Sequence, residues 1–230
     1  MHSEAPHPNP DKVQRIVDAA AEVMRREGYA GTSMKDIAHQ AGVAQGLIHY
    51  YFSSKDELVM MVLKQACGDM LAESLDAFRK AEGGPLERVW PTLEAARERT
   101  RNRPEMWRLF FELLPLSFNN PGLRAEFQGV YDKIIAGTVE MIEEVNRHIP
   151  TALPVDAAQF ARVITATIDG IAVQALLQPD LDIDALYTAF GFVLVSTIAG
   201  SFAVAGQPVP GLEELSALLG GTVTTPGTSA

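Results

Sequence analysis

The chain has 230 residues, of which 47% are hydrophobic and 21% are charged, a globular composition that excludes wholesale disorder. With 19 Lys and Arg against 29 Asp and Glu, the net charge of −10 excludes a strongly basic coat for nucleic acid, although not a local basic face. The single cysteine, Cys67, excludes an intrachain disulfide and a zinc site built from several cysteines, which fits a cytoplasmic protein.

The first ten residues contain prolines and no apolar run, so we expect a flexible leader over 1–10 rather than a secretory signal. Up to about residue 205 the spacing of apolar residues is typical of amphipathic helices, and strand signals are missing. The predicted helices cover residues 11–27, 34–41, 45–51, 55–81, 86–101, 104–118, 121–148, 156–178 and 184–205. Pro91 and Pro115 are expected to kink or end their helices. Gly, Pro, Ser and Thr predominate over 206–230, where we expect a mostly flexible tail.

Local signals support several helix ends. Helix-capping pairs precede three of the predicted helices: Ser33 with Asp36, Ser54 with Glu57, and Asp156 with Gln159. Two short predicted helices meet at a turn that contains Gly42, which indicates a helix-turn-helix motif. Its apolar residues point inward, so the outer face of the second helix stays free to enter the major groove of DNA.

The stretch from Ile16 to about Leu63, centred on "GYAGTSMKDIAHQAGVAQGLIHYYFSSKDELV", resembles the TetR family of bacterial transcriptional regulators. The resemblance implies an all-α fold with an N-terminal three-helix helix-turn-helix DNA-binding domain at 11–57. A C-terminal helical ligand-binding and dimerisation domain would follow at 58–205. Two departures concern base preference rather than DNA binding itself. Leu47 stands where the family usually has a small hydroxyl residue, and His49-Tyr50 reverses a common order.

The resemblance also implies which residues contact DNA. The groove-facing positions are Gln45, Gly46, Leu47, His49 and Tyr50, and the phosphate-facing positions are Thr32, Ser33, Lys35, Tyr51 and Lys55. The chemistry fits, because glutamine can pair with adenine and a lysine ammonium can meet a phosphate. The alternatives are that Leu47 belongs to the core, that His49 bonds to a neighbour, that Tyr51 is partly packing, and that both lysines are solvated surface.

Members of the family commonly bind a small effector between the DNA-binding and dimerisation elements. Dense apolar and aromatic residues on two predicted helices are permissive for such a pocket. The candidate pocket residues are Met106, Trp107, Phe110, Phe111, Phe118, Phe127, Tyr131 and Met141, with Asp169 and Gln174 as polar members. The alternative for each is ordinary core. Asp169 lies in an apolar helix, so its carboxylate must be paired, hydrogen-bonded or hydrated. Its partner would lie either in the dimer interface or in a bound ligand.

Two segments near the C-terminus, 160–177 and 189–205, are apolar on nearly every side, which indicates burial on several sides. We interpret them as a homodimer interface, which in the family is a four-helix bundle. A membrane span over 185–206 competes, but the glycines, the hydroxyl residues and the missing flanking basic cluster argue against a membrane. The arginine-rich run over 97–103 is interpreted as a solvated helix end, with contact to the DNA-binding domain as the alternative.

The sequence therefore predicts a homodimeric repressor that binds a palindromic operator in double-stranded DNA and is released by a small, largely apolar effector. One alternative is a TetR-shaped binding protein without sequence-specific DNA recognition. Another is a helical small-molecule enzyme. Because phosphate-binding loops, nucleophile elbows and metal-ligand spacings are missing from the sequence, we expect no catalytic residues, no metal and no cofactor.

Overall fold

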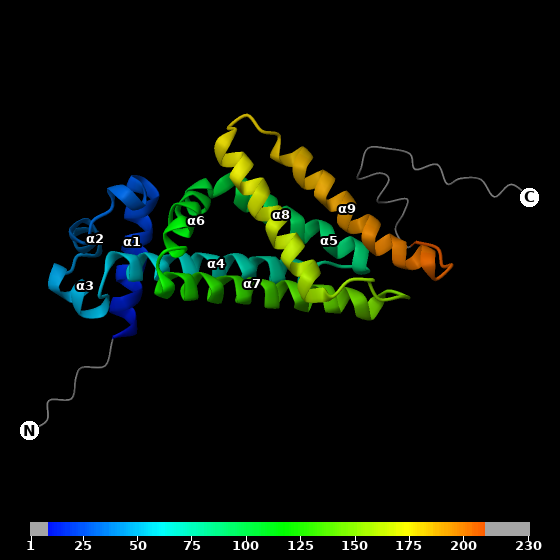
Figure 1. The fold of residues 1–230 in the computed structure, drawn as a ribbon, viewed down its shortest axis with the longest axis horizontal. Coiled ribbons are helices and arrows are strands. Elements are labelled where there is room, and N and C mark those ends of the chain that lie inside the picture. The colour runs from blue at the N-terminus through cyan, green and yellow to red at the C-terminus, as the bar shows by residue number, and fades with distance from the viewer. Residues whose placement is uncertain (1–8, 210–230) are drawn as a thin grey trace, which may run out of the picture. The chain divides into compact units, whose positions relative to one another are not determined.

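The structure, a computed structural model, describes residues 9–209, apart from the side chains of Pro85 and Leu86. Over that range the chain forms nine α-helices and no strand, which confirms the all-α fold class (Figure 1). The helices are α1 (Pro10–Gly31), α2 (Met34–Ala41), α3 (Gln45–Tyr51), α4 (Lys55–Lys80), α5 (Pro85–Asn102), α6 (Pro104–Ser117), α7 (Pro121–His148), α8 (Ala157–Leu177) and α9 (Ile183–Val204). Most of the predicted leader, and the predicted tail from residue 210, lie outside the described residues.

The predicted capping residues form their expected hydrogen bonds. The Ser33 hydroxyl oxygen accepts from the Asp36 N–H at 3.2 Å, and the Asp156 carboxylate accepts from the Gln159 N–H at 3.0 Å. These bonds satisfy amide groups that a helix start leaves without an internal partner. Gly42 ends α2 with φ 61° and ψ 39°, a left-handed conformation that glycine adopts without steric cost.

The predicted helix end at residue 27 and the two predicted proline effects have different outcomes. α1 continues beyond residue 27 to Gly31, with a break at Gly28, whose φ of 70° and ψ of 174° are not helical. Pro91 does not end α5, which continues to Asn102, whereas α6 ends shortly after Pro115.

The described chain forms two compact units, and the first consists of residues up to Met70 together with Asn102–Ile134. It holds α1, α2, α3, the first part of α4, α6 and the first part of α7. Ile37 of α2, Ile48 of α3 and Leu113 of α6 all lie in one hydrophobic core and are fully buried. The helix-turn-helix motif therefore shares its core with α6.

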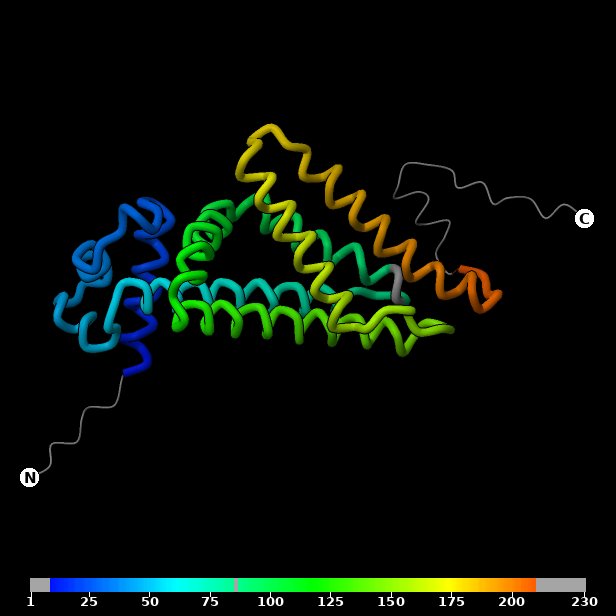
Figure 2. Tube along the Cα trace, viewed as in Figure 1, coloured from blue at the N-terminus to red at the C-terminus, as the bar shows by residue number. Residues whose placement is uncertain are grey.

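The second unit consists of Leu71–Arg101 and the residues from Ile135 onward. Its core takes side chains from α5, α7, α8 and α9, and the chain reverses direction between α8 and α9 (Figure 2). The α5 residue Trp90 packs directly on Gly191 of α9, and a Cβ atom at position 191 would overlap the Trp90 ring. α9 thus approaches α5 closely because residue 191 has no side chain.

By length and composition, α8 and α9 could each cross a membrane. Within the most apolar 18 residues of each helix, 22% of the residues in α8 and 44% of those in α9 are buried inside the chain. Large apolar side chains remain exposed on both helices: Val163, Leu177, Phe192, Val193 and Val204. Large apolar side chains that stay exposed together can mark a surface for protein or membrane contact.

The close approach of α9 to α5 gives a stability prediction. Gly191→Ala is expected to lower the free energy of unfolding by about 1–3 kcal/mol, because the new methyl group displaces the rigid Trp90 ring. Gly129→Ala in α7 is the matched control, since nothing lies within 4 Å of its added Cβ atom. The control should gain up to about 1 kcal/mol from helix propensity. Urea unfolding of both variants measures the difference, and equal effects would contradict the packing described here.

Candidate nucleic-acid interface

The recognition helix α3 presents a polar and aromatic face on a buried anchor. Ile48 is 0% exposed and fixes the helix to the core, while Gln45, Gly46 and His49 are exposed. Tyr50 is 54% exposed and its ring meets that of Tyr51 edge-on at 5.0 Å. Leu47 is partly exposed. The structure thus brings the five predicted groove-facing residues together on one short helix.

Gln45 and His49 lie one helical turn apart on this face. The Gln45 Nε2 and His49 Nε2 atoms are 3.5 Å apart, so the two side chains can orient each other. Both carry donors and acceptors that can reach base edges. This pairing also agrees with the alternative that His49 bonds to a neighbour.

The predicted phosphate-facing residues divide into two groups. Ser33 and Lys35 are exposed at the start of α2, and Tyr51 is partly exposed. Thr32 is 3% exposed, and its hydroxyl donates to the Gly28 carbonyl at 2.7 Å. The Lys55 ammonium donates to the carbonyls of Tyr29 at 2.9 Å and Thr32 at 3.1 Å, and it lies 4.0 Å from the centre of the Tyr29 ring. Thr32 and Lys55 are therefore engaged inside the chain.

Tyr29 is a junction that sequence reasoning did not identify. Its backbone N–H donates to the Glu112 carboxylate of α6 at 3.1 Å, and its hydroxyl donates to the Asp56 carboxylate of α4 at 2.6 Å. Its carbonyl accepts from Lys55. Burial, together with the hydrogen bond to Asp56 and its negative charge, raises the pKa of the Tyr29 hydroxyl to about 12. The phenol therefore stays a hydrogen-bond donor throughout the neutral range.

Five of the predicted pocket residues form one aromatic cluster in the first unit. The Phe110 ring is edge-on to the rings of Phe127 at 5.4 Å and Tyr131 at 5.8 Å, and Trp107 stacks on Phe111 at 6.1 Å. Trp107 is 5% exposed, and among the described residues its indole nitrogen has no hydrogen-bond partner. A buried indole N–H usually finds an acceptor, so this donor is available to one.

The other predicted pocket residues lie outside this cluster. Met106 is partly buried on α6, and Phe118 is 61% exposed beyond its end. Met141, Asp169 and Gln174 belong to the second unit. The Gln174 amide donates to the Gly170 carbonyl within its own helix. The structure therefore groups the predicted aromatic residues of α6 and α7 in the first unit, while the predicted polar members Asp169 and Gln174 belong to the second unit.

Asp169 lies near a buried hydroxyl pair in the second unit. The hydroxyl groups of Thr100 and Tyr187 are 2.8 Å apart, and both side chains are buried. Burial raises the pKa of Tyr187, and the charge of Asp169 adds to this rise, while the bond to Thr100 and the charge of Arg99 oppose it. Asp169 is thus part of the polar surroundings of Tyr187.

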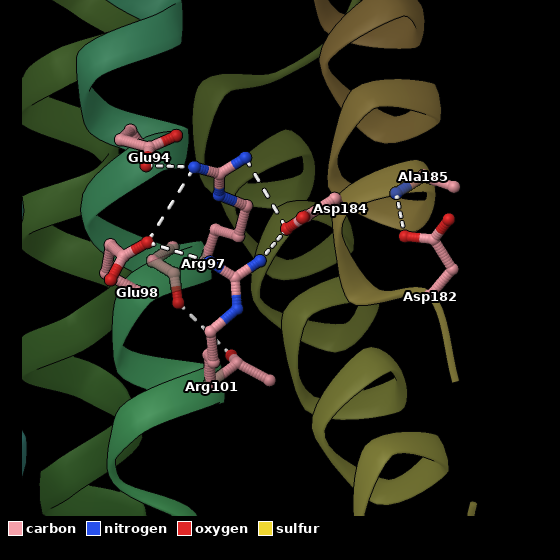
Figure 3. A network of polar contacts seen from close by, with 9 residues as sticks. Glu94, Arg97, Glu98, Arg101, Asp182, Asp184 and Ala185 are labelled. Carbon is pink, nitrogen blue, oxygen red and sulfur yellow. Dashed lines mark hydrogen bonds and ion pairs between the residues drawn. The ribbon is translucent and has the colours of Figure 1, made fainter. Parts of the chain in front are cut away.

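The arginine-rich end of α5 contacts other helices. Figure 3 shows Arg97 and Arg101 reaching toward Asp184 at the start of α9, where both form ion pairs. Arg99 is buried and donates to the Ser74 hydroxyl of α4 at 2.8 Å. The interpretation of this run as a solvated helix end is therefore wrong for Arg97 and Arg99. Glu94 and Glu98 are local partners of Arg97 and Arg101. Asp184 and Ser74 lie far from the run in the sequence, and the local pattern gives no sign of them.

Two family comparisons match separate parts of the chain. Residues 16–60 match the bacterial regulatory proteins of the tetR family. Residues 85–197 match the C-terminal domain of the BetI-type transcriptional repressors. The first range contains α2, α3 and the Tyr29, Lys55 and Asp56 members of the junction, and the second contains Glu112, α6 and α8.

Individual relatives agree with these matches. The HTH-type transcriptional regulator BetI of Agrobacterium fabrum is 27% identical over 172 residues, which cover 74% of this chain and 79% of that protein. The regulator FadR from Bacillus subtilis, solved with stearoyl-CoA, has a TM-score of 0.66 at 22% identity and covers 80% of this chain and 98% of its own. A protein from Saccharomonospora viridis, solved with choline, has a TM-score of 0.66 at 20% identity, over 81% and 96%. The chain therefore belongs to the tetR family of bacterial regulatory proteins and carries a C-terminal domain of the BetI-type transcriptional repressors.

Proposed function

We propose that the chain is a cytoplasmic, homodimeric transcriptional repressor that binds a palindromic operator and is released by a small, largely apolar effector. The observation that carries the proposal is the exposed face of α3, held on the fully buried Ile48, within a helix-turn-helix unit of the tetR family. A short helix on a rigid support can place its N-terminal side chains against base edges.

Lys35 is the phosphate contact that the geometry favours. Its side chain is exposed in the first turn of α2, and the exposed Ser33 precedes it. Phosphate neutralisation is a local property, so an acidic remainder of the chain does not prevent it. Lys55 remains a proposed contact. To meet a phosphate, its ammonium would have to share or leave the two carbonyls that it now binds.

The exposed apolar faces of α8 and α9 support the homodimer. One side of α9 packs into the second unit through Phe190, Leu194 and Ile198, while Phe192 and Val193 remain exposed on the other side. A second copy would cover the same surface on both subunits around a two-fold axis. Two recognition helices would then read two half-sites of a palindrome.

The aromatic cluster of α6 and α7 is the proposed effector site. Its rings are apolar, with Phe110 and Phe127 buried in the core of the first unit, and the Trp107 indole N–H is a buried donor without a partner among the described residues. The fold neighbours solved with stearoyl-CoA and with choline supply two probes of different chemistry. An aromatic surface can accept either, an acyl chain by apolar contact and a quaternary ammonium by cation–π attraction.

The salt dependence of DNA binding tests Lys35. With a duplex recovered by selection from a random pool, Lys35→Ala should reduce the slope of log affinity against log salt by about 1 for each half-site, and so by about 2 for the bound dimer. Lys133→Ala is the control, because it removes the same charge from an exposed position on α7. Equal slopes for the two variants would remove Lys35 from the interface.

Lys55→Ala should also cost at least about 1 kcal/mol of unfolding free energy, because two carbonyls lose a charged donor.

Thermal shifts with choline and stearoyl-CoA test the effector site. At about one hundred times its dissociation constant, a binding probe should raise the melting temperature of the wild type by about 5–10 °C. The rise should be smaller in Trp107→Phe and unchanged in Trp90→Phe, whose indole nitrogen also has no partner among the described residues. Equal rises in both variants would place the ligand elsewhere.

Sedimentation tests the dimer surface. The wild type should sediment as a dimer at micromolar concentration, and Phe192→Asp should shift it toward the monomer, because a charge on an apolar interface loses its water without gaining a partner. Phe118→Asp is the matched control, because Phe118 lies outside α8 and α9 and is 61% exposed against 53% for Phe192. Dissociation of both variants, or of neither, would argue against this surface.

A further inference from the structure

The segment Gly28–Thr32 connects α1 to the capped start of α2, and its backbone groups are bound by side chains. The Gly28 carbonyl accepts from the Thr32 hydroxyl, and the Tyr29 and Thr32 carbonyls accept from Lys55 of α4. Because Gly28 is not helical, the Tyr29 N–H has no carbonyl partner within α1, like an amide group at the start of a helix. It donates to the Glu112 carboxylate of α6 at 3.1 Å.

We propose that Glu112 is a positioning residue that couples α6, and with it the aromatic cluster, to the helix-turn-helix motif. The inference rests on the proposed function, because it assigns the route by which that site acts on DNA binding. The coupling is the hydrogen bond from the Tyr29 N–H, four residues before the Ser33 cap of α2. Both carboxylate oxygens face the break in α1, since Oε1 lies 3.9 Å from a Cβ atom built on Gly28.

The position of Glu112 on α6 explains why it can carry such a signal. Glu112 is exposed, next to Phe111 of the cluster and to the fully buried Leu113 of the core. A ligand that displaces the aromatic rings must move the helix that bears them, because close-packed interiors transmit displacement rather than absorb it. A hydrogen bond weakens steeply when its geometry departs from about 2.7–3.2 Å, so movement of α6 changes how firmly the junction is held.

The coupling must be reciprocal, which allows a test without the natural effector. If α6 affects DNA binding, then DNA binding affects α6 by the same factor. Hydrogen–deuterium exchange of the α6 amides, with and without a saturating duplex selected from a random pool, measures this effect in the full chain. We expect the duplex to slow exchange over 104–117 about fivefold in the wild type, the lower end of typical coupling between sites.

Three substitutions separate the hydrogen bond from the charge. Glu112→Gln removes the charge and keeps an acceptor of the same reach, so it should retain the slowing. Glu112→Ala removes both, and Glu112→Asp keeps the charge but shortens the reach, so both should lose the slowing while still binding the duplex. Asp132→Ala, which removes an exposed carboxylate from α7 in the same unit, should behave as the wild type.

The outcomes distinguish the coupling from the proposed function. Slowing that survives in Glu112→Ala, or that follows charge so that Glu112→Asp retains it and Glu112→Gln loses it, overturns the proposed role of Glu112. Duplex binding by the wild type without any change in α6 overturns it as well. Failure to recover any bound duplex, judged by the anisotropy of a labelled pool, instead overturns the proposed function and removes the basis of the coupling.

Discussion

The break in α1 at Gly28 determines how α1 is bound to α4 and α6 in the first unit. It takes the peptide groups around Tyr29 out of the helical ladder, and each group then needs another partner. Side chains of α4 and α6 supply those partners, through Lys55 and Glu112. Because an unpaired backbone group costs about 1–3 kcal/mol when it is shielded from water, the junction ties the start of α2 to these two helices. α3 follows α2 directly after the turn at Gly42, and Ile37 of α2 and Ile48 of α3 lie in the same core.

The division of the chain by family and its division by packing are different. α6 belongs by sequence to the BetI-type C-terminal segment, residues 85–197, yet it lies in the compact unit of the helix-turn-helix motif. Leu113 of α6 and Ile48 of α3 are both fully buried in one core. α6 carries aromatic side chains of the proposed ligand site. It is joined to the helix-turn-helix motif through the core that they share. The sequence boundary at residue 57 could not reveal this, because it follows local motifs.

Local signals in the sequence were sufficient for α2 and α3. The Ser33 cap and the left-handed Gly42 are short-range features, and the predicted bounds of both helices agree with the structure. Long-range partners were beyond such signals. Lys55 follows Tyr29 by 26 residues, and Glu112 follows it by 83, so neither bond leaves a local pattern. Phe118 illustrates the same limit, since an aromatic residue near a cluster in sequence lies exposed beyond the helix end.

The acidic balance of the chain makes the apolar faces of α8 and α9 relevant to DNA binding. In the first unit, Lys35 is exposed near the recognition helix, while Lys55 is engaged by carbonyls, so one motif offers few free charges to phosphates. Affinity that depends on released counterions is then modest for one copy. Pairing through α8 and α9 would make binding to the second half-site an intramolecular event, which raises the overall affinity although the contacts within each half-site stay the same. The surface that leaves Phe192 and Val193 exposed is therefore the one from which an acidic DNA-binding protein with few free basic groups would gain most.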